Sequence, residues 1–309
     1  MRIVSLQPFA TDILAHFGVG ADLVGVTHLC NVPGGATKAQ VLTVAESKPT
    51  AAPDEDGRTL AAGMGQDSLN VGALKSLVPD IILAEIRAPH PAEFITWAEA
   101  YLLKVTERRV KVVDISVSNL EQMFSVVEQI GGLVADPAEA RKLANKTKAQ
   151  LMAWADSFFE RCKGKKVVVL SSIAPFVVAE RWIPDVVKLL GAKTIQRAPE
   201  RKDQPLTWPD IVAGRPDVII VAPLGMLLAE SVKVLKIVQE LPNWEDIPAV
   251  KRGEVIFCSG VELYRPGPKF LRGAAILVSA VAGLDSGYIT ERDEYFKVRY
   301  LELHRHKFL

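Results

Sequence analysis

The stretch LKSLVPDIILAE at residues 74–85 carries a helical pattern up to Pro79 and an apolar run that starts directly after Asp80. The stretch DIVAGRPDVIIVAP at residues 210–223 repeats this arrangement in the second half of the chain. A proline disfavours helix at the residue before it, and a short, wholly apolar run is typical of a parallel strand covered on both faces. The repetition therefore predicts two lobes built from alternating strands and helices.

Further β-branched runs closed by turn residues extend this pattern in both directions. The runs expected as strands are 2–6, 23–28, 80–85 and 109–115 in the first half, and 165–172, 193–196, 217–223 and 254–260 in the second. Each run of the first set is followed by a loop and then a helical pattern. The fold class predicted from the sequence is α/β, with two βα lobes that have parallel central sheets.

The segment between the two sets, residues 136–164, reads as one long helix. Asp136 is a suitable N-cap, Pro137 suits the first helical position, and Gly164 is a stop signal. About 25 residues at 1.5 Å each give a rod of roughly 37 Å. We therefore expect an N-terminal lobe at 1–135, a connecting backbone helix at 136–164 and a C-terminal lobe at 165–309.

Composition excludes several classes of partner. The 309-residue chain has a formal net charge of +1 and its basic residues are scattered, so nothing indicates binding to nucleic acid or to an anionic membrane surface. The apolar run at 274–284 is shorter than the roughly 20 residues of a membrane-spanning helix. The first expected strand starts at residue 2, with no leader pattern before it. This predicts a cytoplasmic protein, or a periplasmic or extracellular one if a leader has been removed.

Signatures of enzymes are missing from the sequence: there is no nucleophile elbow and no Walker loop. His28 and Cys30 form a compact pair that could hold a soft metal or cobalt. Such a pair is more often a polar loop side chain beside a small buried thiol. We therefore predict no metal site and no catalytic residues.

Loops that follow the expected strands carry the candidate binding residues, because open α/β sheets bind ligands at the carboxyl ends of their strands. These loops are 7–10, 28–33, 85–90, 171–182, 222–226 and 259–268. They supply flat or soft apolar groups and convergent polar groups, a mixture that a large amphipathic ligand requires. The predicted ligand-binding residues are Phe9, His28, Glu85, Arg87, Phe176, Trp182, Met226, Tyr264 and Arg265.

Several ordered motifs resemble the class III periplasmic-binding-protein superfamily with a helical backbone, the solute receptors for cobalamin, siderophores and haem. RIVSLQPFATDIL (2–14) and LVGVTHLCNVP (23–33) resemble the opening of its cobalamin-binding family, and AERWIPDVVKLLGA (179–192) resembles its middle signature. RPDVIIVAPLG (215–225), LPNWEDIPAVKRGEVIFCSG (241–260) and YRPGP (264–268) resemble its C-terminal series. The resemblance implies a non-enzymatic protein that holds cobalamin or a related corrinoid in a cleft between two lobes.

Two departures from this family bear on the partner. Receptors of this type usually carry a glutamate on each lobe, seven residues before the proline of the Pro-Asp motif, for docking on a membrane permease. Gly72 and Pro209 stand at these positions, although Asp210 lies next to the second. Charge pairs steer docking and fix its register, so permease docking is doubtful. The resemblance therefore favours a cytoplasmic relative of the substrate-binding proteins of ABC importers.

Other readings remain open. The cleft departs from the cobalamin-binding pattern at Leu29 and Glu85, where aromatic residues are common, so cobalamin is the leading ligand among several. An enzyme or enzyme accessory could use the same cleft, with Glu85 and His28 as an acid/base pair. The chain could also be an ordinary transport receptor whose leader was removed.

Overall fold

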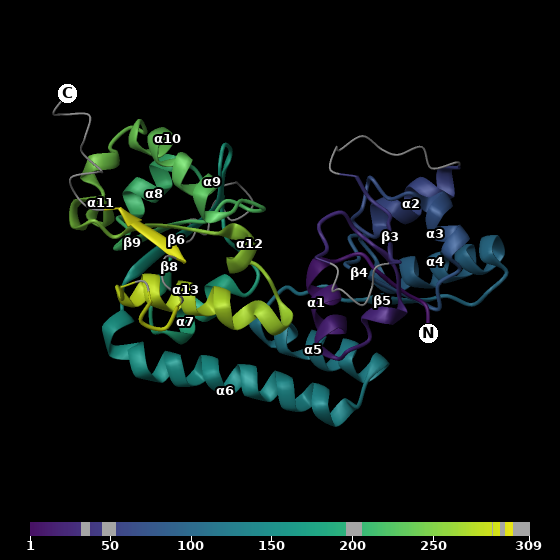
Figure 1. Ribbon diagram of the computed structural model, residues 1–309. Coiled ribbons are helices and arrows are strands. Elements are labelled where there is room, and N and C mark those ends of the chain that lie inside the picture. Colours follow the sequence, from purple (N-terminus) through teal and green to yellow (C-terminus); the bar gives the residue numbers. More distant parts are fainter. Residues whose placement is uncertain (32–37, 45–53, 196–205, 286, 291–293, 299–309) are drawn as a thin grey trace. The chain divides into compact units, whose positions relative to one another are not determined.

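The computed structural model describes residues 1–31, 38–44, 54–195, 206–285, 287–290 and 294–298 of the chain. They form two compact units, which we call the N lobe and the C lobe. The N lobe comprises Met1–Val117 and Glu121–Asn145, and the C lobe comprises Ser118–Leu120 and the chain from Lys146 onward. Each lobe has a β-sheet with helices packed on it (Figure 1). The predicted α/β class with two lobes is confirmed.

The sheet of the N lobe is parallel throughout, with the strand order β3-β2-β1-β4-β5. Its strands are β1 (Ile3–Ser5), β2 (Leu23–Val26), β3 (Gln40–Val41), β4 (Ile81–Ala84) and β5 (Lys111–Asp114). All except β3 lie within the runs predicted as strands, and β3 is too short to produce a pattern in the sequence. Since the strands are parallel, their carboxyl ends meet at one edge of the sheet.

Local signals set where the helices of the N lobe begin. The helices are α1 (Pro8–His16), α2 (Glu55–Gly63), α3 (Val71–Leu77), α4 (Pro91–Thr106) and α5 (Leu120–Val134), with a 3-10 turn at Gly20–Asp22. The side chains of Asp54 and Asn70 cap α2 and α3 by accepting main-chain hydrogen bonds. Pro8 and Pro91 occupy the first positions of α1 and α4, where no N–H is needed.

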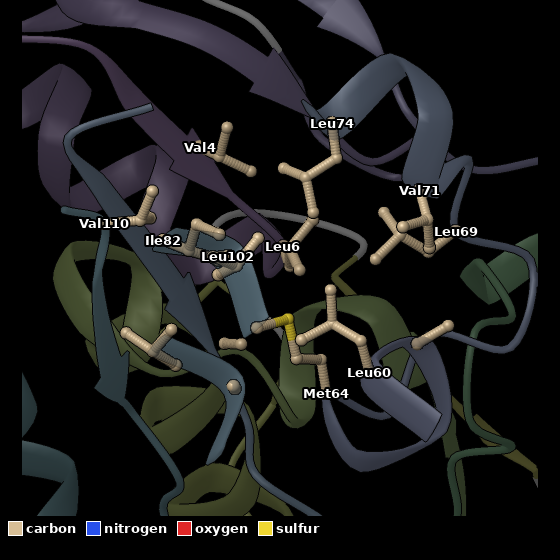
Figure 2. Close-up of a cluster of buried hydrophobic side chains, with 14 of the residues drawn as sticks. Val4, Leu6, Leu60, Met64, Leu69, Val71, Leu74, Ile82, Leu102 and Val110 are labelled. Atoms are coloured by element: carbon tan, nitrogen blue, oxygen red, sulfur yellow. The ribbon is translucent and has the colours of Figure 1, made fainter. Parts of the chain in front are cut away.

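A hydrophobic core joins one face of this sheet to α2, α3 and α4. In Figure 2, side chains from β1 and β4 converge with those of the helices, among them Leu60, Met64, Leu74 and Ile82. All four side chains are fully buried. This core fixes the sheet on which the loops at the carboxyl edge stand.

The predicted long helix is present as α6 (Pro137–Cys162). Asp136 accepts a hydrogen bond from the N–H of Ala138 at 2.9 Å, and Gly164 follows the helix with a φ of 76°. The division between the two compact units falls inside α6, between Asn145 and Lys146. The domain limits stated above stay a prediction.

The sheet of the C lobe is mixed, which corrects the expectation of a parallel sheet. Its order is β11-β10-β9-β6-β7, and β8 also pairs with β6. The strands are β6 (Lys166–Ile173), β7 (Phe176–Val178), β8 (Lys193–Thr194), β9 (Val218–Val221), β10 (Val255–Cys258) and β11 (Tyr295–Val298). Strands β7 and β11 are antiparallel to their neighbours. They were missed because β7 follows β6 through a tight turn at 174–175 and both lie at the edges of the sheet.

Helices pack on the C-lobe sheet as well (Figure 1). They are α7 (Ile183–Leu189), α8 (Trp208–Gly214), α9 (Leu228–Lys233), α10 (Leu235–Gln239), α11 (Pro248–Arg252), α12 (Gly260–Leu263) and α13 (Phe270–Ala282), with 3-10 turns at Trp244–Asp246 and Gly267–Lys269. One core includes Trp208, Trp244 and Phe257. No helix in the described part of the chain combines the length and the apolarity that crossing a membrane demands.

The Pro-Asp motif plays the same structural role in both lobes. Asp80 accepts a hydrogen bond from the N–H of Arg2 at 2.7 Å, just before β1. Asp217 accepts one from the N–H of Lys166 at 2.9 Å, at the start of β6. Each aspartate thus fixes the start of its own strand against the central neighbouring strand, and the repeat read from the sequence corresponds to a repeated hydrogen bond.

Candidate functional site

The loops after β1, β2, β4 and β5 form the carboxyl edge of the N-lobe sheet, which we call the N-lobe edge (residues 6–8, 27–31, 85–90 and 115–117). Main-chain hydrogen bonds extend the sheet into these loops, from Leu6 N–H to Leu83 and from Ile115 N–H to Ala84. Gln66 adds a side-chain bond of 2.9 Å to the carbonyl of Leu6. The loops therefore start from a rigid base.

His28 is exposed on the loop after β2. Its Nδ1 lies 2.7 Å from the hydroxyl of Thr43, and the same hydroxyl accepts a hydrogen bond from the main-chain N–H of His28 at 3.0 Å. Thr43 itself is buried. The imidazole is thus fixed at its base and open at its far side.

Cys30, two residues further on, is half-buried, and its sulfur points toward hydroxyl groups. Thr11 Oγ1 donates to Sγ at 3.1 Å, and Thr27 Oγ1 lies 3.2 Å from it. Thr11 also bonds the hydroxyl of Ser5 at 2.9 Å. This polar network connects the β2 loop to β1 and α1, and it holds the sulfur of Cys30 in contacts with two hydroxyl groups. Among the described residues, no group of three metal-ligating side chains is found.

The loop after β4 contains Glu85 and Arg87 in different environments. Glu85 is buried, whereas Arg87 is exposed. The N–H of Arg87 bonds the carbonyl of Gly63 at 2.8 Å, and its side chain lies so close to Gly65 that a Cβ there would be 2.6 Å from Nε. Gly65, with a φ of 64°, thus leaves room for the arginine side chain along the N-lobe edge.

The suggested acid/base pair of Glu85 and His28 gains no support from the fold. Their parent strands β4 and β2 lie on opposite sides of β1, which separates the strand ends by about 10 Å. Glu85 is buried and His28 is exposed. Phe9, the remaining predicted residue of this lobe, is buried in α1 and lies within the lobe rather than on its surface.

The C lobe has a comparable set of loops, which we call the C-lobe edge (residues 171–178, 222–227 and 259–265). The N–H of Leu224 bonds the carbonyl of Ser171 at 2.9 Å, and the N–H of Val261 bonds that of Met226 at 3.3 Å. A Cβ at Gly260 would lie 2.0 Å from the carbonyl oxygen of Pro223. The loops after β6, β9 and β10 are therefore joined, and glycine at 260 permits their close approach.

The loop that follows β9 at the C-lobe edge exposes large apolar side chains. Leu224 is 71% exposed, Leu227 is 56% exposed and Met226 is 37% exposed. Sequence reasoning selected Met226 and missed the two leucines, although all three follow the same strand. Three large apolar side chains exposed on one short loop are unusual for a surface with no binding role.

The aromatic residues predicted for the C lobe lie at different depths. Phe176, on β7, is half-buried and stacks on Trp208, with ring centroids 5.4 Å apart. Trp208 stacks in turn on Trp244 at 5.9 Å. Trp182 is only 2% exposed, so it lies in the interior of the lobe just before α7. Phe176 therefore exposes part of its ring at the C-lobe edge, whereas the ring of Trp182 is not accessible from the surface.

Tyr264 and Arg265 are half-buried residues that follow α12. Burial raises the pKa of the Tyr264 hydroxyl well above its usual value, and the nearby Cys258 thiol adds to this rise. The phenol is therefore neutral at physiological pH. Elsewhere in the C lobe, a cavity of about 320 Å³ lies beside β6, β7 and α7, and none of the predicted site residues lines it.

The family to which this fold belongs follows from comparison with known proteins. The sequence profile described as "Periplasmic binding protein" matches residues 3–261. The chain belongs to the periplasmic binding protein family. It is therefore a solute-binding protein, and the resemblance to class III receptors is confirmed.

Three similar proteins illustrate the range of this family. The vitamin B12-binding protein of Vibrio vulnificus is 22% identical over 275 residues, which cover 87% of this chain and 86% of the relative. The periplasmic vitamin B12 binding protein of Vibrio cholerae superposes with a TM-score of 0.64 at 19% identity, covering 91% of this chain and 96% of the other. The periplasmic heme-binding protein of Roseiflexus sp. RS-1 gives 0.63 at 19% identity, covering 91% and 98%.

These comparisons bear on location as well. Two of the three proteins are described as periplasmic, as is the family. The expectation of a cytoplasmic protein therefore finds no support in the relatives.

Proposed function

We propose that this protein binds cobalamin or a related corrinoid as a non-enzymatic solute-binding protein. The carrying observation is the exposed apolar loop of the C-lobe edge, formed by Leu224, Met226 and Leu227. A corrin presents a wide apolar plate, and covering exposed apolar surface yields roughly 25 cal/mol for each Å² removed from water. The vitamin B12-binding relatives support this choice of ligand.

Polar groups needed at the rim of a corrin are also available. Arg87 is exposed and positioned over Gly65 on the N-lobe edge, and Arg265 lies at the C-lobe edge. Guanidinium groups suit the amide fringe of a corrin because they present several N–H donors in one plane. Phe176, Met226 and Tyr264 of the C-lobe edge can contact the apolar plate. Trp182 is buried in the same lobe, and Phe9 and Glu85 are buried in the N lobe.

The test is binding of a coloured ligand by the purified full-length protein. Hydroxocobalamin is added, the sample is passed through a gel-filtration column, and the visible spectrum of the protein peak is recorded. We expect co-elution of cobalamin in an equimolar amount and its release unchanged. Haemin is tested in parallel because one solved relative binds haem. Binding of haemin alone, or of neither compound at high micromolar concentration, contradicts the proposal.

We further propose that the chain does not dock on a permease through the usual pair of glutamates. Gly72 and Pro209 both lie exposed at the second position of a helix, in α3 and α8. The carboxylate of Asp210 already accepts hydrogen bonds from the N–H and the hydroxyl of Thr207, at 2.9 and 2.6 Å. The carboxylate of Asp210 therefore caps α8, which makes Asp210 a poor replacement for the docking glutamate of the C lobe.

This docking proposal can be tested with a vitamin B12 importer in nanodiscs. A double variant with Gly72→Glu and Pro209→Glu places carboxylates in first helical turns, where negative charge is favourable. We expect the double variant to be retained by the importer more strongly than the wild type. Equal retention of both proteins contradicts the proposal.

A further inference from the structure

The imidazole of His28 has the surroundings of a metal ligand. A ligating histidine usually has one ring nitrogen fixed by a hydrogen bond, which sets the tautomer and leaves the other nitrogen for the metal. Here Nδ1 lies 2.7 Å from the hydroxyl of the buried Thr43. With the proton on Nδ1, the ring donates to Thr43 Oγ1 and Nε2 carries the lone pair. Within the described residues, the ring has no other hydrogen bond.

The main chain restrains the ring as well. Thr43 Oγ1 accepts from the N–H of His28 at 3.0 Å, so a single hydroxyl holds both ends of the residue. Thr43 follows β3, which pairs with β2 in parallel, and this pairing places it beside the β2 loop. The position of the imidazole is therefore set by the sheet, as a preformed ligand site requires.

Cys30 is not a second ligand in this arrangement. Its sulfur contacts the hydroxyls of Thr11 and Thr27 inside the loop, whereas His28 is exposed. A closed site that binds a bare metal ion needs about four protein ligands. A metal held within a macrocycle already has four equatorial nitrogens and needs only an axial one from the protein. A single fixed, exposed histidine suits the second case.

The residue next to His28 is an exposed leucine. Leu29, the following residue, is 67% exposed. An exposed leucine beside an exposed imidazole nitrogen matches a flat macrocycle with a metal at its centre, because the leucine can cover part of the plate.

We propose that Nε2 of His28 is an axial ligand to the metal of a bound macrocycle, a cobalt corrin or an iron porphyrin, and that Thr43 is its positioning residue. For the cobalt corrin, this inference rests on the proposed function. The Nε2 lone pair forms the bond to the metal, and a water molecule leaves the metal in exchange. No electron is transferred, and the proton stays on Nδ1, bonded to Thr43.

Cobinamide is the sharpest probe, because it is a corrin that lacks the nucleotide base and so brings no axial nitrogen of its own. The full-length protein is mixed with cobinamide, binding is measured by equilibrium dialysis, and the cobalt is reduced to the divalent state for electron paramagnetic resonance. We expect each cobalt line to be split into three by one nitrogen. Labelling histidine with heavy nitrogen should change the splitting to two.

Four variants assign the nitrogen and its positioning residue. His28→Ala should lose the splitting, and added imidazole should restore it. His16→Ala is the matched control, since His16 is also exposed on the N lobe but ends α1, away from the edge where α1 begins. It should behave as the wild type. Thr43→Val should weaken cobinamide binding about 10- to 100-fold, the usual range for loss of a group that orients a ligand, whereas Thr43→Ser should bind normally.

Ferric haemin provides the second arm and separates the two sources of metal. If the ligand is an iron porphyrin, a histidine-type shift of the Soret band should appear in the wild type and vanish in His28→Ala. The inference is overturned if either macrocycle binds and the spectra of wild type and His28→Ala are identical. If hydroxocobalamin co-elutes with the protein but neither cobinamide nor haemin binds, this inference fails and the proposed function stands; if none of the three compounds binds, both fail.

Discussion

The carboxylate of Asp217 accepts a hydrogen bond of 2.9 Å from the main-chain N–H of Lys166 and contacts the guanidinium of Arg252 at 2.6 Å. This arrangement ties the start of β9 to the start of β6. Partial burial raises the pKa of Asp217, but the hydrogen bond and Arg252 together outweigh it, so the pKa lies below its usual value.

We expect Asp217→Ala to lower the free energy of unfolding by about 1–2 kcal/mol at pH 7, since a hydrogen bond to a charged group is lost. A lowered pKa in the folded state stabilises the fold above the unfolded pKa of about 3.9, and this contribution disappears as pH falls through the folded value. Urea titrations of wild type and variant should therefore converge in acid. Asp246→Ala, which removes an exposed ion pair with Lys251, should change stability by less than about 0.5 kcal/mol. A gap between wild type and Asp217→Ala that persists at pH 2 contradicts the assignment.

Gly260→Ala tests the close approach of the loops at the C-lobe edge. The added Cβ would meet the carbonyl oxygen of Pro223 at 2.0 Å, and a backbone atom cannot move aside cheaply. Such a clash should cost at least about 1–3 kcal/mol of stability, as overpacking does. Gly132→Ala in α5 is the control, because its Cβ would meet nothing within 4 Å. That variant should be neutral or stabilised by up to about 1 kcal/mol. Thermal unfolding that ranks the two variants in the opposite order contradicts this account.

Trp182→Ala should act mainly on stability. The indole is 2% exposed, so its removal leaves a cavity and should cost about 3–5 kcal/mol. Trp97→Ala is a suitable comparison, because Trp97 is half-buried and stacks on the buried Tyr101. Trp97→Ala should lower the free energy of unfolding by less than Trp182→Ala does. If Trp182→Ala unfolds like the wild type in chemical denaturation yet loses cobalamin binding, the residue contacts the ligand directly.

Leu224→Ser tests the apolar loop on which the proposed function depends. Leu224 is 71% exposed in the protein, so the fold should keep its stability. If the leucine is fully covered by ligand, about 1.5–3 kcal/mol of binding is lost, which is roughly a 10- to 100-fold rise in Kd. Ile237→Ser removes an apolar residue of similar exposure on α10 and should leave Kd unchanged. Calorimetric titration with hydroxocobalamin compares the two. Equal affinities in both variants exclude the loop from the site.

The thiols should differ in reactivity. Burial raises the pKa of Cys258 to about 12, and burial also raises that of Cys162 despite the nearby Lys165 and Arg161. A thiol reacts as its thiolate, so both should resist a disulfide reagent at neutral pH. The half-buried Cys30 is the one thiol of the three that we expect to react in the native protein. Colorimetric titration should give one thiol before unfolding and three after it. A Cys30→Ser variant that still reacts rapidly contradicts this assignment.

Much of the fold was accessible from the sequence because its signals are local. Apolar runs after Pro79 and Pro216 predicted two central strands, and Asp136 and Gly164 marked the ends of the long helix. The ends of a helix depend on the backbone preferences of residues that are neighbours in the chain. A short apolar run likewise indicates a buried strand from its own residues alone. The strands β3, β7 and β11 were not predicted, because a short strand at the edge of a sheet forms by pairing with the adjacent strand and leaves little pattern in its own sequence.

The same distinction between local sequence signals and tertiary contacts applies to the candidate site. The sequence by itself determined which loops follow the strands, and therefore that His28, Arg87 and Met226 belong to carboxyl-edge loops. Only the tertiary structure decided which side chains reach the surface. Trp182 and Leu224 are both apolar and both follow C-lobe strands, yet one is buried and the other exposed. The physical reason is that burial and orientation are set by contacts between residues distant in sequence. Thr43 and His28, held together by the pairing of β2 and β3, are one such contact.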